Sequence, residues 1–286
     1  MVPDFIQARD SDGLRVFLIN EIFRDGAFFQ ACRDGAVEMC KMLISTGVDV
    51  NSAVVDKQTP LFIACLHAHP ACVDFLLAQG ANVNVGEMSG RRTPLMATAH
   101  KDDTSVGLTL DQFIENRCLC MRSLLTANAN VDQTDKYGYT ALIFATWNFR
   151  LAEILVHASQ NVNILYNNKL SILHIACARN NAGVVDLLLE RGADIDAMDV
   201  DGLTPLHTAC IKMFPTIIDL LLRHGAVFDI VDNNGITALQ LALFQTSTSP
   251  NRVIVLQLMA TCAQTRLGAC SADWIRLARH EQHREL

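Results

Sequence analysis

The chain lacks long apolar runs, long basic runs and the short motifs of common enzymes. No window holds 18 consecutive apolar residues, as a membrane-spanning helix would need. The longest basic run is Arg91-Arg92 and the net charge is −7, which argues against a polybasic membrane patch or a nucleic-acid backbone site. Neither a Gly-Lys-Ser/Thr phosphate loop, His-Glu-x-x-His nor Gly-x-Ser-x-Gly occurs, so we expect no enzymatic activity and no cofactor.

Signals for export are also missing. Asp4 stands where a secretory signal would carry basic residues, and there is no Asn-x-Ser/Thr acceptor for glycosylation. We therefore expect a cytoplasmic protein, with the nucleus left open as a second location.

Against these absences stands a repeat of 33 residues. Ser171-Ile172-Leu173-His174-Ile175-Ala176-Cys177 returns as Thr204-Pro205-Leu206-His207-Thr208-Ala209-Cys210, and 204 − 171 = 33. The leucine runs 187–189 and 220–222, and the Gly-Ala pairs at 192 and 225, keep the same spacing. This period and this Thr-Pro-Leu-His block resemble the ankyrin repeat.

The resemblance implies an all-α fold, an ankyrin-repeat solenoid of stacked helix-turn-helix units joined by β-hairpin-like loops. About seven repeats fit residues 26–260, with a capping helix in residues 1–25 and a C-terminal cap or tail in residues 261–286. It also implies that His174 and His207 are structural hydrogen-bonding residues rather than metal ligands.

Two repeats depart from the regular length. Repeat three spans 128 − 93 = 35 residues between its motif and its ending, against 80 − 59 = 21 in repeat two. We place the 14 extra residues at about 102–116, as a loop between the two helices of the repeat. Repeat four spans only 159 − 140 = 19 residues, which predicts a tightened link between its helices.

The ten cysteines are expected to be reduced thiols. Four of them, Cys32, Cys65, Cys177 and Cys210, follow an alanine at one position of the repeat. A small apolar residue that faces the neighbouring repeat explains this position, because a free cysteine packs like a small hydrophobe. We predict neither a disulfide nor a metal site.

A solenoid of this kind is suited to binding another protein through its concave face and loop tips. Large aromatic residues, which often dominate interface energies, gather at repeat four. The predicted partner-binding residues are these aromatics, the basic residues near them and positions that the family uses for contact: Phe144, Trp147, Tyr137, Tyr139, Arg91, Arg92, Lys101, Lys136, His100, Leu66, Arg179 and Lys212.

Four basic members of this set favour an acidic or extended segment of a protein partner, bound by a monomer; they are Arg91, Arg92, Lys101 and Lys136. In the alternative, Trp147 only fills space left by the shortened repeat and the neighbouring insertion. The leading function is a non-catalytic adaptor or scaffold. Two others stay open, namely the substrate-recognition subunit of a cullin-RING ubiquitin ligase and an ankyrin-type inhibitor of a transcription factor.

The ligase alternative depends on a SOCS box, and Leu267-Gly268-Ala269-Cys270 does not have the Leu-x-x-x-Cys spacing of that box. Asparagine hydroxylation is a further expectation. Asn51, Asn84 and Asn163 each end a repeat and follow a leucine by eight residues, which resembles the pattern that ankyrin hydroxylases favour. Turn hydrogen bonds are the alternative role of these asparagines.

Overall fold

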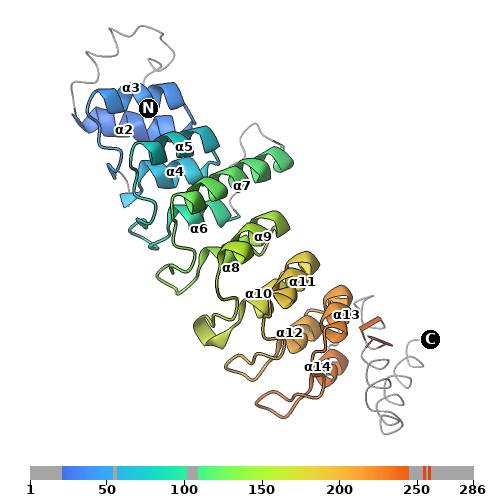
Figure 1. Cartoon of the computed structure of the whole chain (residues 1–286). Helices are drawn as coiled ribbons and strands as arrows, with labels where there is room; N and C mark the ends of the chain where they lie inside the picture. Colours follow the sequence, from blue (N-terminus) through green and yellow to red (C-terminus); the bar gives the residue numbers. More distant parts are fainter. Residues whose placement is uncertain (1–20, 54–56, 102–108, 245–253, 256, 259–286) are drawn as a thin grey trace, which may run out of the picture. The chain divides into compact units, whose positions relative to one another are not determined.

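The computed structural model describes residues 21–53, 57–101, 109–244, 254–255 and 257–258. Within them the protein is helical, and pairs of short helices follow one another along the chain (Figure 1). They fall into two compact units, residues 1–136 and residues 137–286, which are described separately. No helix in the described part is long and apolar enough to span a bilayer.

The first unit contains three helix pairs among its described residues. These are α2 (Glu21–Arg33) with α3 (Val37–Ser45), α4 (Pro60–Leu66) with α5 (Pro70–Ala78), and α6 (Pro94–Ala99) with α7 (Leu110–Thr126). The first helices α2, α4 and α6 contact one another in order, and α3, α5 and α7 form a second layer. The core lies between the layers, where Leu61, Leu76 and Leu124 are fully buried.

The second unit repeats this arrangement. Its helices are α8 (Ala141–Ala145), α9 (Phe149–Ala158), the 3-10 turn η3 (Asn167–Lys169), α10 (Ile172–Ala178), α11 (Ala182–Glu190), α12 (Pro205–Ile211), α13 (Pro215–Arg223) and α14 (Ala238–Phe244). Again the first helices α8, α10, α12 and α14 form one layer, and α9, α11 and α13 form the other. The ankyrin-type helical stack predicted from the sequence is therefore confirmed.

Local chemistry explains where the first helix of a repeat begins. Thr59 precedes α4 and its hydroxyl accepts a hydrogen bond from the Phe62 N–H at 3.2 Å. Pro60 occupies the first helical position, where a missing N–H has no partner to lose. Thr204 and Pro205 start α12 in the same way.

The two histidines have the structural role that the resemblance implied. Nδ1 of His174 accepts from the N–H and the hydroxyl of Ser171, while Nε2 donates to the Leu203 carbonyl of the next repeat at 2.9 Å. His207 binds Thr204 and Ile236 in the same pattern. Burial lowers the pKa of both imidazoles, more than the carbonyl contacts raise it.

The sequence predicted that the whole insertion in repeat three would be a loop, but part of it is helical. Residues 110–116 belong to α7, which has 17 residues against nine in α5. Thr109 and Gln112 form a capping box at the start of this helix. In the added turns, the side chains of Phe113 and Ile114 are buried. Residues 102–108 of the predicted insertion lie outside the described residues.

The predicted tight link in repeat four is wrong. Three residues join α8 to α9, as three residues join α4 to α5, and the shortening falls on α8 itself, with five residues against seven. The Thr146 hydroxyl donates to the Ile143 carbonyl and helps to end the helix there. A shortened repeat can thus keep its link and lose part of a helical turn.

Three predicted elements lie partly or wholly outside the described residues, namely the two caps and the second helix of repeat seven. Helix α2 includes Glu21, so it crosses the predicted boundary between residues 25 and 26. The rest of the N-terminal capping helix and the C-terminal cap at 261–286 lie outside the described residues. In repeat seven, residues 254–255 and 257–258 are helical and Val255 is buried.

Candidate functional site

Four aromatic rings meet at the start of the second unit. The Tyr139 ring has its centroid 6.3 Å from Tyr137, 6.4 Å from Phe144 in an edge-to-face arrangement, and 6.2 Å from Tyr166. Tyr137 is 54% exposed, whereas Tyr139 and Phe144 are half-buried. We call Tyr137, Tyr139, Phe144 and Tyr166 the aromatic cluster. Tyr137, Tyr139 and Phe144 expose part of their rings beside the buried Tyr166, a surface suited to an apolar or aromatic side chain.

Polar contacts hold the cluster in place. The buried Tyr166 hydroxyl lies 2.9 Å from the Thr140 hydroxyl, and the Asn167 side chain donates to the Tyr137 carbonyl at 2.6 Å. The sequence identified three of the four rings but missed Tyr166, which comes from the next hairpin. Trp147, also predicted here, lies half-buried in the link between α8 and α9.

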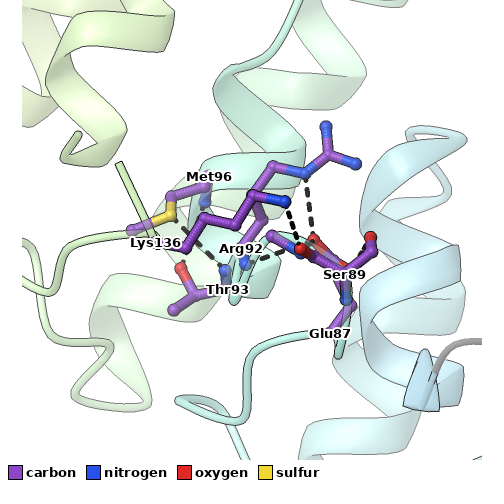
Figure 2. A network of polar contacts seen from close by, with 7 residues as sticks. Glu87, Ser89, Arg92, Thr93, Met96 and Lys136 are labelled. Atoms are coloured by element: carbon purple, nitrogen blue, oxygen red, sulfur yellow. Dashed lines mark hydrogen bonds and ion pairs between the residues drawn. The ribbon is translucent and has the colours of Figure 1, made fainter. Parts of the chain in front are cut away.

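The predicted basic residues Arg91, Arg92, Lys101 and Lys136 all lie in the first unit. Two of them contact the hairpin that connects repeats two and three, Arg92 from within it and Lys136 from the next hairpin (Figure 2). Arg92 Nε lies 3.2 Å from the Glu87 carboxylate, and Lys136 Nζ donates to the Ser89 carbonyl at 2.5 Å. Arg91 and Lys101 are exposed.

Glu87 organises this hairpin. Its side chain is 1% exposed and accepts from the Ser89 N–H at 2.7 Å and from the Gly90 N–H at 2.8 Å (Figure 2). Burial alone would raise the pKa of Glu87, but the hydrogen bonds from Ser89 and Arg92 outweigh it and lower the pKa. The carboxylate is therefore an ionised structural centre.

The contact positions carried over from the family differ between the units. The residue before the motif alanine is buried in the first unit, at Ile63 and Ala97, but half-buried in the second, at Phe144, Ile175 and Thr208. Leu66 and His100 are half-buried, and Lys212 is exposed. At this position the side chains of the second unit are therefore more exposed than those of the first.

Arg179 also has a structural role that the sequence did not suggest. Its guanidinium donates to the Ile143 carbonyl at 2.8 Å and to the Thr146 hydroxyl, at the end of the shortened α8. Asn181 donates to the Thr146 carbonyl at 3.0 Å. Repeat five therefore caps the short helix of repeat four.

The three asparagines predicted as hydroxylation targets form one set of contacts. Their side-chain oxygens each accept from a backbone N–H of the next repeat, namely Asn82 for Asn51, Asn130 for Asn84 and Asp194 for Asn163, each at 2.8 Å. The asparagines therefore make the turn hydrogen bonds that the sequence analysis gave as their alternative role. Hydroxylation stays a prediction.

The sequence reasoning missed a row of exposed aliphatic side chains in the second unit. Leu165, Met198 and Val231 occur 33 residues apart and are 55%, 48% and 49% exposed. Their equal spacing was the signal that could have revealed them. Asp194, Asp201 and Asp229, each within four residues of Met198 or Val231 in the sequence, are exposed, as is Lys169, four residues after Leu165.

Between residues 11 and 262 the chain matches a known repeat family. The family model described as Ankyrin repeats (3 copies) matches residues 11–87, 28–112, 110–199 and 173–262. Among solved structures, the human ASB11 ankyrin repeat domain has a TM-score of 0.66 and 27% identity, over 81% of this chain and 96% of that chain. The ankyrin repeat domain of Bcl-3, at 20% identity and a TM-score of 0.63, shares the fold over 81% of this chain and 97% of that chain.

Curated relatives match over shorter stretches. Ankyrin repeat and SOCS box protein 5 of Oryctolagus cuniculus is 34% identical over 29% of this chain and 25% of its own length. Ankyrin repeat and SOCS box protein 6 of Homo sapiens is 25% identical over 57% and 38%. E3 ubiquitin-protein ligase KEG of Arabidopsis thaliana is 28% identical over 49% and 7%. The chain thus spans well under half the length of these relatives.

Proposed function

Because the chain belongs to the ankyrin-repeat family, we propose that it is a non-catalytic adaptor or scaffold whose second unit binds an extended segment of a partner protein. Ankyrin repeats are protein–protein interaction modules, and the fold is generally not catalytic. The observation that carries the proposal is the aromatic cluster, because Tyr137 is exposed while its neighbours fix its surroundings.

Charge refines the kind of partner. Four of the basic residues expected to attract an acidic segment, Arg91, Arg92, Lys101 and Lys136, lie in the first unit. There Arg92 contacts Glu87 of its own hairpin, and Lys136 donates to the Ser89 carbonyl of that same hairpin. In the second unit, Asp194, Asp201 and Asp229 are exposed within four residues of the exposed Met198 or Val231. Complementary charge therefore favours an extended segment that carries apolar and basic side chains.

A second candidate is a substrate receptor of a cullin-RING ubiquitin ligase. What supports it is that several relatives are named as SOCS box proteins or as a ubiquitin ligase. The segment in which a SOCS box would be sought lies outside the described residues. Elongins and a cullin among the captured proteins would favour this candidate.

Partner capture from cell lysate tests the proposal. The wild-type chain, a Tyr137→Ala/Trp147→Ala variant and a Phe149→Ala control are compared, with captured proteins identified by mass spectrometry. Phe149 is an exposed aromatic residue of the same unit outside the cluster. We expect the double variant to lose a dominant partner by tenfold or more, roughly the loss of one interface hot spot. Equal capture by all three folded chains would contradict the proposal.

A further inference from the structure

Three buried thiols converge in the first unit. Cys32 comes from α2, Cys40 from α3 and Cys72 from α5, and all three are 0% exposed. The Cys40 sulfur lies 3.7 Å from that of Cys32 and 3.6 Å from that of Cys72. All three sulfur atoms are within 4.8 Å of one another. In the described residues, this is the one group of three or more potential metal ligands at such distances.

The distances match those between thiolates that share one metal ion. With metal–sulfur bonds of about 2.3 Å, sulfur atoms lie about 3.8 Å apart around a tetrahedral ion and about 4.0 Å apart around a trigonal one. Two sides of the cysteine triangle are already near these values. Only the side between Cys32 and Cys72 is left to adjust, and it is at most 4.8 Å long.

The second unit shows that packing alone does not require these thiols. Residues 145 positions further on have the same place in the repeat, since 177 − 32 = 185 − 40 = 217 − 72 = 145. The counterparts of Cys32, Cys40 and Cys72 are Cys177, Val185 and Ile217, which are also 0% exposed. The corresponding helices begin and end in register, as α3 and α11 do at 37–45 and 182–190.

We propose that Cys32, Cys40 and Cys72 form a binding site for one soft metal ion, and that monovalent copper is the ion that suits it. Thiolates select soft ions, chiefly Cu(I) and zinc. Structural zinc takes four protein ligands in a tetrahedron, whereas this group contains three. Cu(I), in contrast, forms a complete coordination shell with three thiolates. This site would replace the purely apolar role that the sequence predicts for Cys32.

The site lies in the first unit, and its ligands come from both helices of repeat one and from the second helix of repeat two. A bound ion would therefore join two neighbouring repeats, as a structural metal does in small folds. It does not depend on the partner-binding proposal for the second unit. Each proposal can fail without the other.

The test uses the full chain with its thiols reduced, under anaerobic conditions. Cu(I) is added during refolding, because the buried site must open to admit it, and weakly held copper is removed with a competing chelator. The site is removed by a Cys40→Val/Cys72→Ile variant, which copies the packing of the second unit. A Cys177→Ala variant is the control, since it removes a buried thiol at the counterpart of Cys32.

We expect about one copper per chain in the wild type and the control, with thiolate-to-copper absorption and a raised melting temperature. In the double variant, retention should fall to about a tenth or less. Circular dichroism checks that this variant is folded. Equal retention by the double variant, or no retention by the wild type, would overturn the proposal. Preferential retention of zinc over Cu(I) in a parallel titration would overturn the assignment to copper.

Discussion

The two units build the same hairpin around different carboxylates. In the first unit, Glu87 closes a hairpin by pairing its N–H with the Arg92 carbonyl, five residues on. In the second, Asp199 and Asp232 close hairpins in which the partner carbonyl is four residues on. The longer side chain of Glu87 spans the extra residue. The repeats therefore share a hydrogen-bonded turn, although the acidic residue at its start is Glu in one unit and Asp in the other.

The units also differ where the fold allows freedom. The first has three buried thiols where the second has one thiol and two aliphatic residues. At the third position of the first helix of a repeat, the first unit has Phe62 or Met96. Two repeats of the second unit have a histidine there that bonds to the next repeat. We infer that buried contacts peculiar to the first unit stabilise it. The second unit has the more regular core, and we infer that its surface carries the partner site.

The largest predicted effect comes from Arg117, the buried cation of the first unit. It donates to the carbonyls of Thr98 at 2.8 Å and of His100, and it lies over the Phe113 ring at 4.5 Å. An Arg117→Met variant keeps the apolar stem but leaves the end of α6 without these donors. We expect a loss of roughly 2–4 kcal/mol in the free energy of unfolding, measured by denaturant titration.

Arg179 provides the matched comparison in the second unit, because it caps α8 in a similar way but is exposed. An Arg179→Met variant should lose about 1 kcal/mol. Equal losses for the two variants would mean that the first unit does not depend on its buried contact as we infer.

Glu87 is expected to have an intermediate effect. Its folded-state pKa lies below the ordinary 4.5, so its charge stabilises the fold fully above about pH 4.5, and this contribution is lost as the pH falls through the folded-state value. A Glu87→Gln variant should lose about 1–2 kcal/mol at neutral pH. Its acid unfolding curve should be flatter than that of the wild type. A curve as steep as the wild type would show that Glu87 does not titrate in the unfolding transition.

The histidines of the second unit are expected to have a small effect that depends on pH. Because burial lowers their pKa, their contribution is fully present above about 6.5 and is lost as the pH falls through the lower folded-state values. Protonation would place a proton on Nδ1 of His174, which accepts from Ser171, and each lost bond is worth about 1 kcal/mol.

Hydrogen exchange at pH 7 and pH 5.5 measures this difference by region. Amides of α10 and α12 should lose protection at the lower pH more than those of α4 and α6. A His174→Gln/His207→Gln variant should lose this sensitivity, since Gln240 already caps α14 through Thr237. Equal loss of protection in both units would contradict the assignment to histidine.

Much of the fold could be predicted because a repeated structural unit leaves a repeated motif in the sequence. The Thr-Pro pair at 59–60 and the 33-residue spacing fixed the helix starts, since capping chemistry is local. The positions of the extra residues before 116 were predicted, but their helical state was not. The Thr109–Gln112 capping box was visible in the sequence and carried that information.

The candidate site was harder to predict, because it depends on contacts between repeats. Tyr137, Tyr139 and Phe144 stood out as rare aromatic residues, whereas Tyr166 joins them only through the packing of two hairpins. Arg179 looked like a surface contact, and its bond to Ile143 arises from a shortened helix. The meeting of Cys32, Cys40 and Cys72 depends on side-chain directions that a 33-residue spacing does not give.

Site-resolved hydrogen exchange of the full chain, with and without its captured partner, tests most directly whether the second unit binds the partner. We expect binding to protect the hairpins of the second unit, around Tyr137–Phe144 and around Leu165, Met198 and Val231. The hairpin around Glu87 in the first unit should stay unchanged. Protection confined to the first unit, with the second unit unaffected, would show that the partner binds elsewhere than we propose.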